Sequence, residues 1–293
     1  MPNAKNATAE QVGKPKIIVV GQGGAGKTAQ ILTLPGRTFA YLFDPAALST
    51  LRGHDIDYEL FVPGKVRLSA QALAEKAKKD PTLGTEDASN TYREWEQDYE
   101  DKTKAGYWDN FDNIAFDSFT TFSDIVMDRV LFLNGRAGHF PQQDDWTAQM
   151  QTVMNVVRTF SSMNKLLFFT AHDEFKQDET TSRMQNIIIL TGKLRTKVPL
   201  MFSDIWHLEH QADAKGSKYV AQTRPDRMNP SIRCSVRGLG MYEDITITNW
   251  DKPQESGIGN ILRTKLGYDP SKNSTKGVSN VPPAGVAKAM GKT

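Results

Sequence analysis

The sequence is short of the residues that would place it in several large classes of protein. Its single cysteine, Cys234, excludes an internal disulfide framework and a cysteine-based zinc site. No apolar run approaches the ~18 residues of a membrane-spanning helix, so no membrane association is expected. Basic residues exceed acidic ones only by 36 to 34, so bulk charge alone does not hold the chain to nucleic acid. Residues 1–14 form a polar, flexible arm without a signal-peptide pattern, and we expect a reducing, cytoplasmic setting.

Short apolar runs alternate with helical periodicity along the rest of the 293 residues. This alternation predicts an α/β fold with a mostly parallel central sheet flanked by helices. Strands are expected at 17–20, 38–43, 113–116, 166–171, 204–210, 219–222 and 245–250. Helices are expected at 27–34, 69–79, 90–104, 119–133 and 146–160, and loops at 134–144 and 173–185. In such sheets ligands bind beyond the carboxyl ends of the strands.

The domain pattern is one main unit with an extension. Residues 15–250 form the main domain, with a charged helical insert at about 65–110 whose second helix, 90–104, is expected to be solvated. Residues 251–293 form a C-terminal extension. From about 270 it is basic, rich in proline, glycine and serine, and expected to be disordered.

Residues 21–28 carry the strongest signal of the sequence, because they fit the phosphate-binding pattern G-x-x-x-x-G-K-[ST]. Glycines let the chain curl so that its N–H groups point at an anion, and the following helix adds its positive end. In this pattern Lys27 reaches the β- and γ-phosphates and the Thr28 hydroxyl binds Mg²⁺. The expected nucleotide-binding residues are Gly21, Gln22, Gly23, Gly24, Ala25, Gly26, Lys27, Thr28 and Ala29.

Asp117 follows three apolar residues and so ends a buried strand. P-loop proteins place a magnesium-binding aspartate at such a point, and the other interpretation is a cap of the helix that begins near Phe119. The next residue is Ser118, where AAA+ and terminase motors have a water-activating glutamate. Its absence disfavours a packaging or helicase motor.

These features together resemble the RecA-like ATPases, and more narrowly the phage-encoded AAA-domain nucleotide-binding proteins, which include RecA-like single-strand annealing proteins. The resemblance covers about residues 15–250. It is carried by GQGGAGKT at 21–28, YLFDP at 41–45, NIAFDS at 113–118, LLFFTAH at 166–172 and YVAQTRPDR at 219–227. It implies a RecA-like P-loop core, ATP and Mg²⁺ as cofactors, and single-stranded DNA as partner. It also implies self-association into a filament or ring, a single-strand-binding protein as a further partner, and host cytoplasm if the protein is phage-encoded.

The resemblance also implies catalytic roles. Asp44 is a candidate for the group that positions the attacking water, although Ala46 stands where RecA has a glutamate two residues further on. His172 stands where the family has a polar γ-phosphate sensor, and Arg224 and Arg227 where basic residues reach the nucleotide of the adjacent subunit. Each of these residues also has a purely structural interpretation. Asp44 could open an Asp-Pro turn, and His172 could be a histidine whose hydrogen bonds are made at the strand end. Arg224 and Arg227 could be solvated surface residues.

The family's DNA-binding loops match about 134–146 and 173–190 here. Basic groups there neutralise phosphates and aromatic rings stack on bases. The second loop also contains four acidic residues, and all of these residues are equally compatible with ordinary solvated surface. The candidate DNA-binding residues are Arg136, Lys176, Lys193, Arg195 and Lys197.

The function predicted from these residues is a Mg²⁺-ATP-dependent ATPase that acts on single-stranded DNA in phage recombination, annealing or replication. Two other functions stay open. A nucleotide-gated scaffold with little turnover fits Ala46, and a small-molecule or nucleotide kinase needs an arginine-rich lid that the sequence does not offer.

Overall fold

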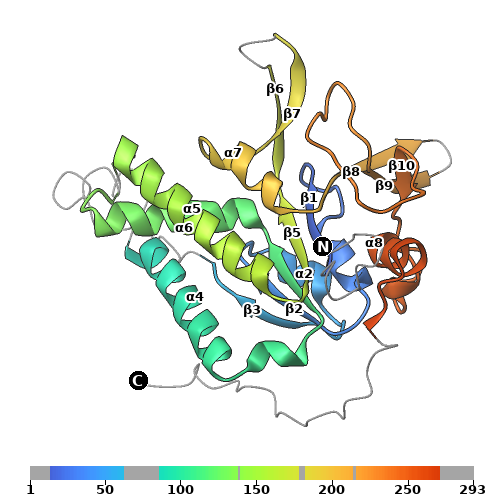
Figure 1. Cartoon of the computed structure of the whole chain (residues 1–293), viewed down its shortest axis with the longest axis horizontal. Coiled ribbons are helices and arrows are strands. Elements are labelled where there is room, and N and C mark those ends of the chain that lie inside the picture. The colour runs from blue at the N-terminus through green and yellow to red at the C-terminus, as the bar shows by residue number, and fades with distance from the viewer. Residues whose placement is uncertain (1–13, 63–85, 138, 178–181, 214–215, 271–293) are drawn as a thin grey trace, which may run out of the picture.

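The computed structural model describes residues 14–62, 86–137, 139–177, 182–213 and 216–270. Its centre is an eight-stranded sheet in the order β10-β9-β8-β1-β5-β4-β2-β3, parallel from β8 to β3 and antiparallel at β9 and β10 (Figure 1). The strands are β1 (Lys16–Val20), β2 (Thr38–Leu42), β3 (Asp57–Leu60), β4 (Asn113–Asp117), β5 (Leu166–Ala171), β8 (Asp204–Asp213), β9 (Gly216–Gln222) and β10 (Tyr242–Asp244). The predicted α/β class with a mostly parallel sheet between helices is confirmed.

Helices cover both faces of this sheet (Figure 1). Ile18 and Val20 of β1 face the side of the three long helices, while Ile17 and Val19 face the other side. This alternation is the pleat of a strand that is buried on both faces. The helical elements are η2 (Thr28–Thr33), α2 (Ala47–Leu51), α4 (Glu86–Lys104), η3 (Tyr107–Asn110), α5 (Phe119–Leu133), α6 (Gln143–Ser162), α7 (Leu194–Lys197), η4 (Pro199–Met201), η5 (Pro253–Glu255), α8 (Gly257–Ile261) and η6 (Leu262–Leu266). Within the described ranges, no helix is long and apolar enough to cross a membrane.

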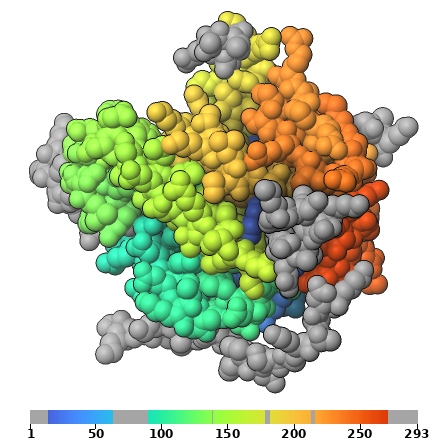
Figure 2. All heavy atoms as spheres, viewed as in Figure 1, coloured from blue at the N-terminus to red at the C-terminus, as the bar shows by residue number. Residues whose placement is uncertain are grey.

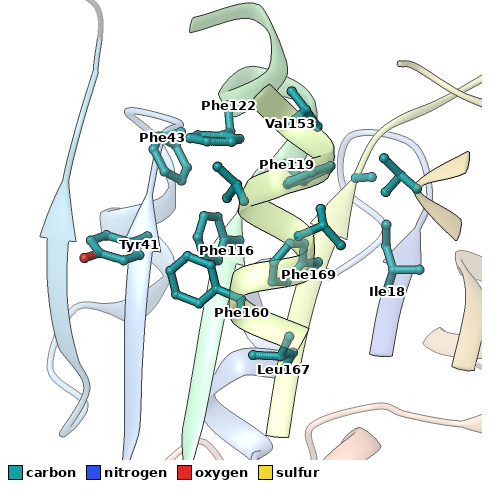
Figure 3. Packing of buried hydrophobic residues seen from close by; sticks show 14 of the residues in the cluster. Ile18, Tyr41, Phe43, Phe116, Phe119, Phe122, Val153, Phe160, Leu167 and Phe169 are labelled. Atoms are coloured by element: carbon teal, nitrogen blue, oxygen red, sulfur yellow. The ribbon is translucent and has the colours of Figure 1, made fainter. Parts of the chain in front are cut away.

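The helix predicted at 90–104 exists, but the prediction that it is solvated is wrong. Tyr92 and Trp95 of α4 are buried, and Tyr99 packs against the same core as Phe116 and Phe122 (Figure 3 shows the latter two). The Trp95 and Phe122 ring centroids lie 4.8 Å apart. A narrow aromatic stripe at helical spacing is enough to anchor a helix whose other faces are charged. The preceding predicted helix, 69–79, lies outside the described residues.

The loop predicted at 173–185 is wrong, because its two ends form a hairpin. Strands β6 (Asp173–Gln177) and β7 (Met184–Ile188) pair antiparallel as a separate two-stranded sheet. The hairpin stands out from the body of the molecule at the top of Figures 1 and 2. Most of its residues face solvent, so its sequence lacks the apolar alternation by which a half-buried strand is recognised.

The strand predicted at 245–250 is also wrong. The last strand, β10, comes earlier and pairs Tyr242 with Gln222 of β9. The Tyr219 N–H donates to the Thr246 side chain at 2.9 Å, so a hydroxyl replaces a backbone carbonyl there. Beyond it the chain continues as turns rather than as strand.

Residues 251–270 pack on the main sheet domain. Ile258 of α8 and Leu262 of η6 are fully buried in the core beneath β1 and η2. The packed domain therefore extends beyond residue 250. The arm (1–13 of the predicted 1–14) and the predicted basic tail beyond 270 lie outside the described residues.

A buried carboxylate fixes the start of α6. Asp145 accepts hydrogen bonds from Arg136 Nε at 2.7 Å, Asn134 Nδ2 at 2.6 Å and the Gln142 N–H at 2.8 Å. The hydrogen bonds from Arg136 are the main reason that the pKa of Asp145 lies well below its usual range. This group stabilises the fold while it is ionised.

Replacing Asp145 by asparagine is expected to lower the free energy of unfolding, because Arg136 then loses its carboxylate partner. Since the folded-state pKa is depressed, the carboxylate's full contribution is present above its unfolded pKa of about 4. The difference between parent and Asp145→Asn should therefore be constant near neutral pH and shrink as the pH falls below about 4. Urea unfolding from pH 7 to pH 3 measures it; a difference independent of pH would contradict this account.

Candidate functional site

The loop between β1 and η2 curls back on itself at residues that must be glycine. Gly24 and Gly26 have φ angles of 84° and 83°, which side chains rarely adopt. A Cβ at Gly21 would lie 2.5 Å from the Leu208 carbonyl oxygen, and one at Gly26 would lie 3.0 Å from the Tyr219 ring. The neighbouring strands β8 and β9 thus hold this loop tightly in place.

Lys27 lies over the mouth of this loop. Its ammonium donates to the carbonyls of Gly21 at 2.7 Å and Gln22 at 2.9 Å, and it lies 3.4 Å from His172 Nδ1. Burial lowers the pKa of Lys27, and the negative charges of Asp117, Asp173 and Asp44 act in the opposite direction. A buried cation among carboxylates is well placed to attract an anion together with a divalent metal ion.

The sheet order brings Asp117 to Thr28. Strand β5 lies between β1 and β4, and the carboxyl ends of all three strands meet at one edge. Thr28 Oγ1 donates to Asp117 Oδ2 at 2.8 Å, and Thr170 donates to Oδ1. Burial raises the pKa of Asp117, while these hydrogen bonds and Lys27 act against the rise.

Asp44 and His172 meet at the same edge, after β2 and β5. His172 Nε2 lies 3.7 Å from Asp44 Oδ2, and Thr121 donates to the other oxygen of Asp44. Burial alone would raise the pKa of Asp44, but the interactions with His172, Thr121 and Ser118 hold it below its usual range. His172 thus bridges Lys27 and Asp44.

A cavity of about 480 Å³ lies in front of these groups. That volume suits a nucleotide or similar small molecule. Of the predicted nucleotide-binding residues, Gly23, Gly24, Gly26, Lys27, Thr28 and Ala29 line it, together with Asp44, Asp117 and His172, whereas Gly21, Gln22 and Ala25 do not.

The rest of the lining was not predicted. It comes from η2, α2, β9 and the segment after β10, and comprises Gln30, Ala46, Ala47, Thr50, Tyr219, Thr246, Ile247 and Trp250. Tyr219 and Ala46 lie in or beside segments that carry the family resemblance, but nothing in the sequence indicates that these residues line a cavity. The pairing of β9 with β8 and β10 brings Tyr219 and the segment after β10 to the cavity, whereas the residues of η2 and α2 reach it because these helices directly follow the glycine loop and Asp44.

Arg224 and Arg227 do not line the cavity. Arg224 is half-buried, and its guanidinium lies 3.5 Å from the Leu239 carbonyl. Arg227 is exposed beside Met184, at the end of the hairpin where β6 stops and β7 begins. Neither arginine reaches the cavity of its own subunit among the described residues.

The candidate DNA-binding residues divide into two groups. The Arg136 guanidinium is held by Asp144 and Asp145 at the start of α6, so its charge is already neutralised. Lys176 on β6 is exposed, as are Lys193, Arg195 and Lys197 around the short helix α7. Figure 1 shows α7 beside the foot of the hairpin, and Arg195 of α7 lines one pocket with residues 185–188 of β7.

Comparison with known proteins gives one family and a set of distant structures. A family model described as an AAA domain (AAA_24) matches residues 13–231. The KaiC-like protein PH0186 from Pyrococcus horikoshii OT3 is 12% identical, with 83% of this chain and 88% of that chain covered and a TM-score of 0.38. The flagellar accessory protein FlaH from Methanocaldococcus jannaschii is 13% identical, with 80% and 86% covered and a TM-score of 0.35. No curated protein matches the chain.

Proposed function

Since the chain belongs to the AAA_24 family of AAA domains, we propose that it is a RecA-like ATPase that binds Mg²⁺-ATP and acts on single-stranded DNA. The proposed setting is phage recombination, annealing or replication in the host cytoplasm. The observation that carries the proposal is the convergence of Lys27, Thr28, Asp117, Asp44 and His172 on one nucleotide-sized cavity. These groups come from four strand ends that are distant in the sequence.

The phosphate end of the cavity supplies charge stabilisation. In this motif the loop amides and the lysine bind the β- and γ-phosphates, and Gly23, Gly24, Gly26 and Lys27 line the cavity here. Charge that develops on a transferring phosphoryl group is stabilised most by donors that are already in place. The Lys27 ammonium, which is held over the loop by two carbonyls, is such a donor.

The residues present fit a magnesium ion. Thr28 Oγ1 and the Asp117 carboxylate are adjacent oxygen donors, which is the ligand type that Mg²⁺ prefers. Bound there, the ion would supply charge neutralisation for the phosphates. Thr170 of β5 donates to the Asp117 carboxylate and so fixes its orientation toward Thr28.

Asp44 is the proposed water-positioning group. Its lowered pKa makes it a weak base, which suits orienting a water molecule better than removing its proton before the reaction. His172 lies between Asp44 and Lys27 and is the proposed γ-phosphate sensor. Asp173, the next residue, opens β6, so a movement of His172 would be passed directly to the hairpin.

The hairpin and α7 form the proposed DNA-binding surface. Lys176, Lys193, Arg195 and Lys197 offer cations for phosphates, and the half-exposed Phe175 offers a ring on which a base can stack. Because Arg224 and Arg227 lie away from the cavity of their own subunit, they are proposed to act on the nucleotide of a neighbour. Self-association into a filament or ring on DNA follows from that role, and a single-strand-binding protein remains a proposed further partner.

ATP turnover with and without single-stranded DNA tests the proposal. The parent is expected to be stimulated by DNA, and a variant with Lys193, Arg195 and Lys197 changed to alanine is expected to lose most of that stimulation. When the logarithm of DNA affinity is plotted against the logarithm of salt concentration, the slope should become less steep by about one for each cation that no longer pairs with a phosphate. The control replaces three exposed lysines elsewhere, Lys104, Lys252 and Lys265, and removes the same charge. Equal DNA stimulation in both triple variants would contradict the proposed surface.

A nucleotide-gated scaffold is the second candidate. The observation in its favour is that a methyl group, Ala46, lines the cavity near Asp44 at the position where RecA has a glutamate. Tight ATP binding without turnover, with or without DNA, would support the scaffold over the ATPase. Turnover that appears only with a small acceptor would instead support a kinase.

A further inference from the structure

The cavity lining divides into two chemically different parts. One part holds the glycine loop, Lys27 and the two aspartates. The other, which we call the apolar wall, holds Ala46, Ala47, Thr50, Tyr219, Thr246, Ile247 and Trp250. Among the described residues, no member of the apolar wall carries a charge. The part with the glycine loop and Lys27 therefore suits an anion, and the apolar wall suits a flat, weakly polar group.

The apolar wall combines an exposed aromatic ring with small residues. Trp250 keeps 51% of its surface exposed although it lines the cavity. Its ring centroid lies 6.4 Å from that of His54, which follows α2. Ala46, Ala47 and Thr50 come from the start and body of that same helix. Small side chains in the same cavity as a large exposed ring leave room for a planar ligand to stack on that ring.

Several polar groups on this side already have partners inside the protein. Thr246 Oγ1 accepts from the Tyr219 N–H at 2.9 Å. Gln30 donates to the Ile245 carbonyl at 3.0 Å and accepts from the Ile258 N–H at 2.8 Å. These two side chains are held in the fold and do not offer a dedicated pattern of donors and acceptors to a ligand. The hydroxyls of Thr50 and Tyr219 also belong to the wall, but a hydroxyl can both donate and accept and so pairs with either purine. Recognition here therefore rests mainly on stacking and buried area.

We propose that the apolar wall is the nucleobase subsite of the proposed ATPase, that Trp250 stacks on the base, and that it accepts purines generally. This inference rests on the proposed function and adds a prediction about substrate class. A ring system with two fused rings covers more of the Trp250 face than a pyrimidine does, so purine nucleotides bind more tightly. With no dedicated hydrogen-bond pattern, adenine and guanine are poorly distinguished.

Binding of ATP, GTP, CTP and inorganic tripolyphosphate, each with Mg²⁺, tests the proposal by calorimetry. Parent affinities for ATP and GTP should agree within about tenfold, with CTP and tripolyphosphate weaker. Trp250→Ala should weaken ATP and GTP binding by about tenfold and leave tripolyphosphate binding unchanged. Trp250→Phe should retain most of the affinity, because a smaller ring still stacks.

Trp146→Ala is the matched control, because it removes a partly exposed tryptophan from α6 that does not line the cavity. The turn at Trp250 is closed by Asn249, whose carbonyl accepts from the Lys252 N–H at 3.3 Å and whose Oδ1 accepts from the Asp251 N–H at 2.9 Å. Because the Trp250 side chain takes no part in these bonds, both Trp250 variants should fold.

Two outcomes would overturn the inference while the proposed function stands. In the first, the parent binds ATP but Trp250→Ala does not change that affinity, or changes ATP and tripolyphosphate affinities equally. In the second, ATP binds over about a hundredfold more tightly than GTP, which needs a hydrogen-bond pattern that this wall lacks. A parent chain that binds neither ATP nor tripolyphosphate would overturn both proposals.

Discussion

Replacing Lys27 by methionine or alanine is expected to lower ATP turnover by about a hundredfold or more, the usual effect of removing one preorganised group that stabilises transition-state charge. Lys27 is 6% exposed, and its ammonium lies against the glycine loop, the cavity and His172. No other lysine or arginine among the described residues lines this cavity. Without this ammonium, the loop amides and a magnesium ion at Thr28 and Asp117 would have to stabilise the developing charge on the phosphates by themselves.

Single-turnover measurements separate chemistry from binding in this test. Lys27→Met keeps the length and most of the packing of the side chain, so its melting temperature should stay close to that of the parent. Thr28→Ser, which keeps the hydroxyl beside Asp117, is the matched conservative variant and should retain turnover within about tenfold. A Lys27→Met enzyme that turns ATP over at the parental rate would show that phosphate chemistry takes place elsewhere on the molecule.

The phosphate side of the site was predictable because its parts obey local rules. Asp117 and His172 each follow a continuous apolar run, and Asp44 follows a third. Parallel strands bring their carboxyl ends to one edge, where ligands bind, and the sheet order brings these three residues to Lys27 and Thr28 at that edge. Here short-range patterns and one general property of parallel sheets were sufficient.

The apolar wall and the hairpin could not be predicted in the same way. Trp250 reaches the cavity because β10 ends at Asp244, and beyond it the Tyr219 N–H of β9 bonds to the Thr246 side chain instead of to a backbone carbonyl. No residue pattern in the sequence predicts that change of partner. The hairpin is exposed, so burial imposed no alternation on its sequence. The aromatic stripe of α4 was hidden among acidic residues, although Tyr92, Trp95 and Tyr99 do have helical spacing.

Helix α8 packs unusually closely against η2, the helix that follows the phosphate loop. We therefore expect that adding one methyl group at this contact strongly lowers the stability of the fold. A Cβ at Gly259 would lie 1.6 Å from the Thr33 carbonyl oxygen and 3.0 Å from the Leu34 nitrogen. The Gly259 N–H donates to Thr33 Oγ1 at 2.9 Å, so the backbone of α8 is tied to a side chain of η2 at this point. Because the obstructing atoms belong to the backbone of η2, no side-chain rotation can relieve the clash.

Gly259→Ala is therefore expected to destabilise the fold by about 3 kcal/mol or more, as severe overpacking does. For a domain of this size the melting temperature should fall by about 6–12 °C. Gly240→Ala is the matched control, because its added Cβ would meet nothing closer than 3.5 Å. Since η2 begins at Thr28, α8 displaced by the new methyl group also moves the phosphate loop, and ATP affinity should fall with stability. Thermal unfolding with and without Mg²⁺-ATP measures both effects. If Gly259→Ala and the Gly240→Ala control had the same melting temperature, α8 would not pack against η2 as described.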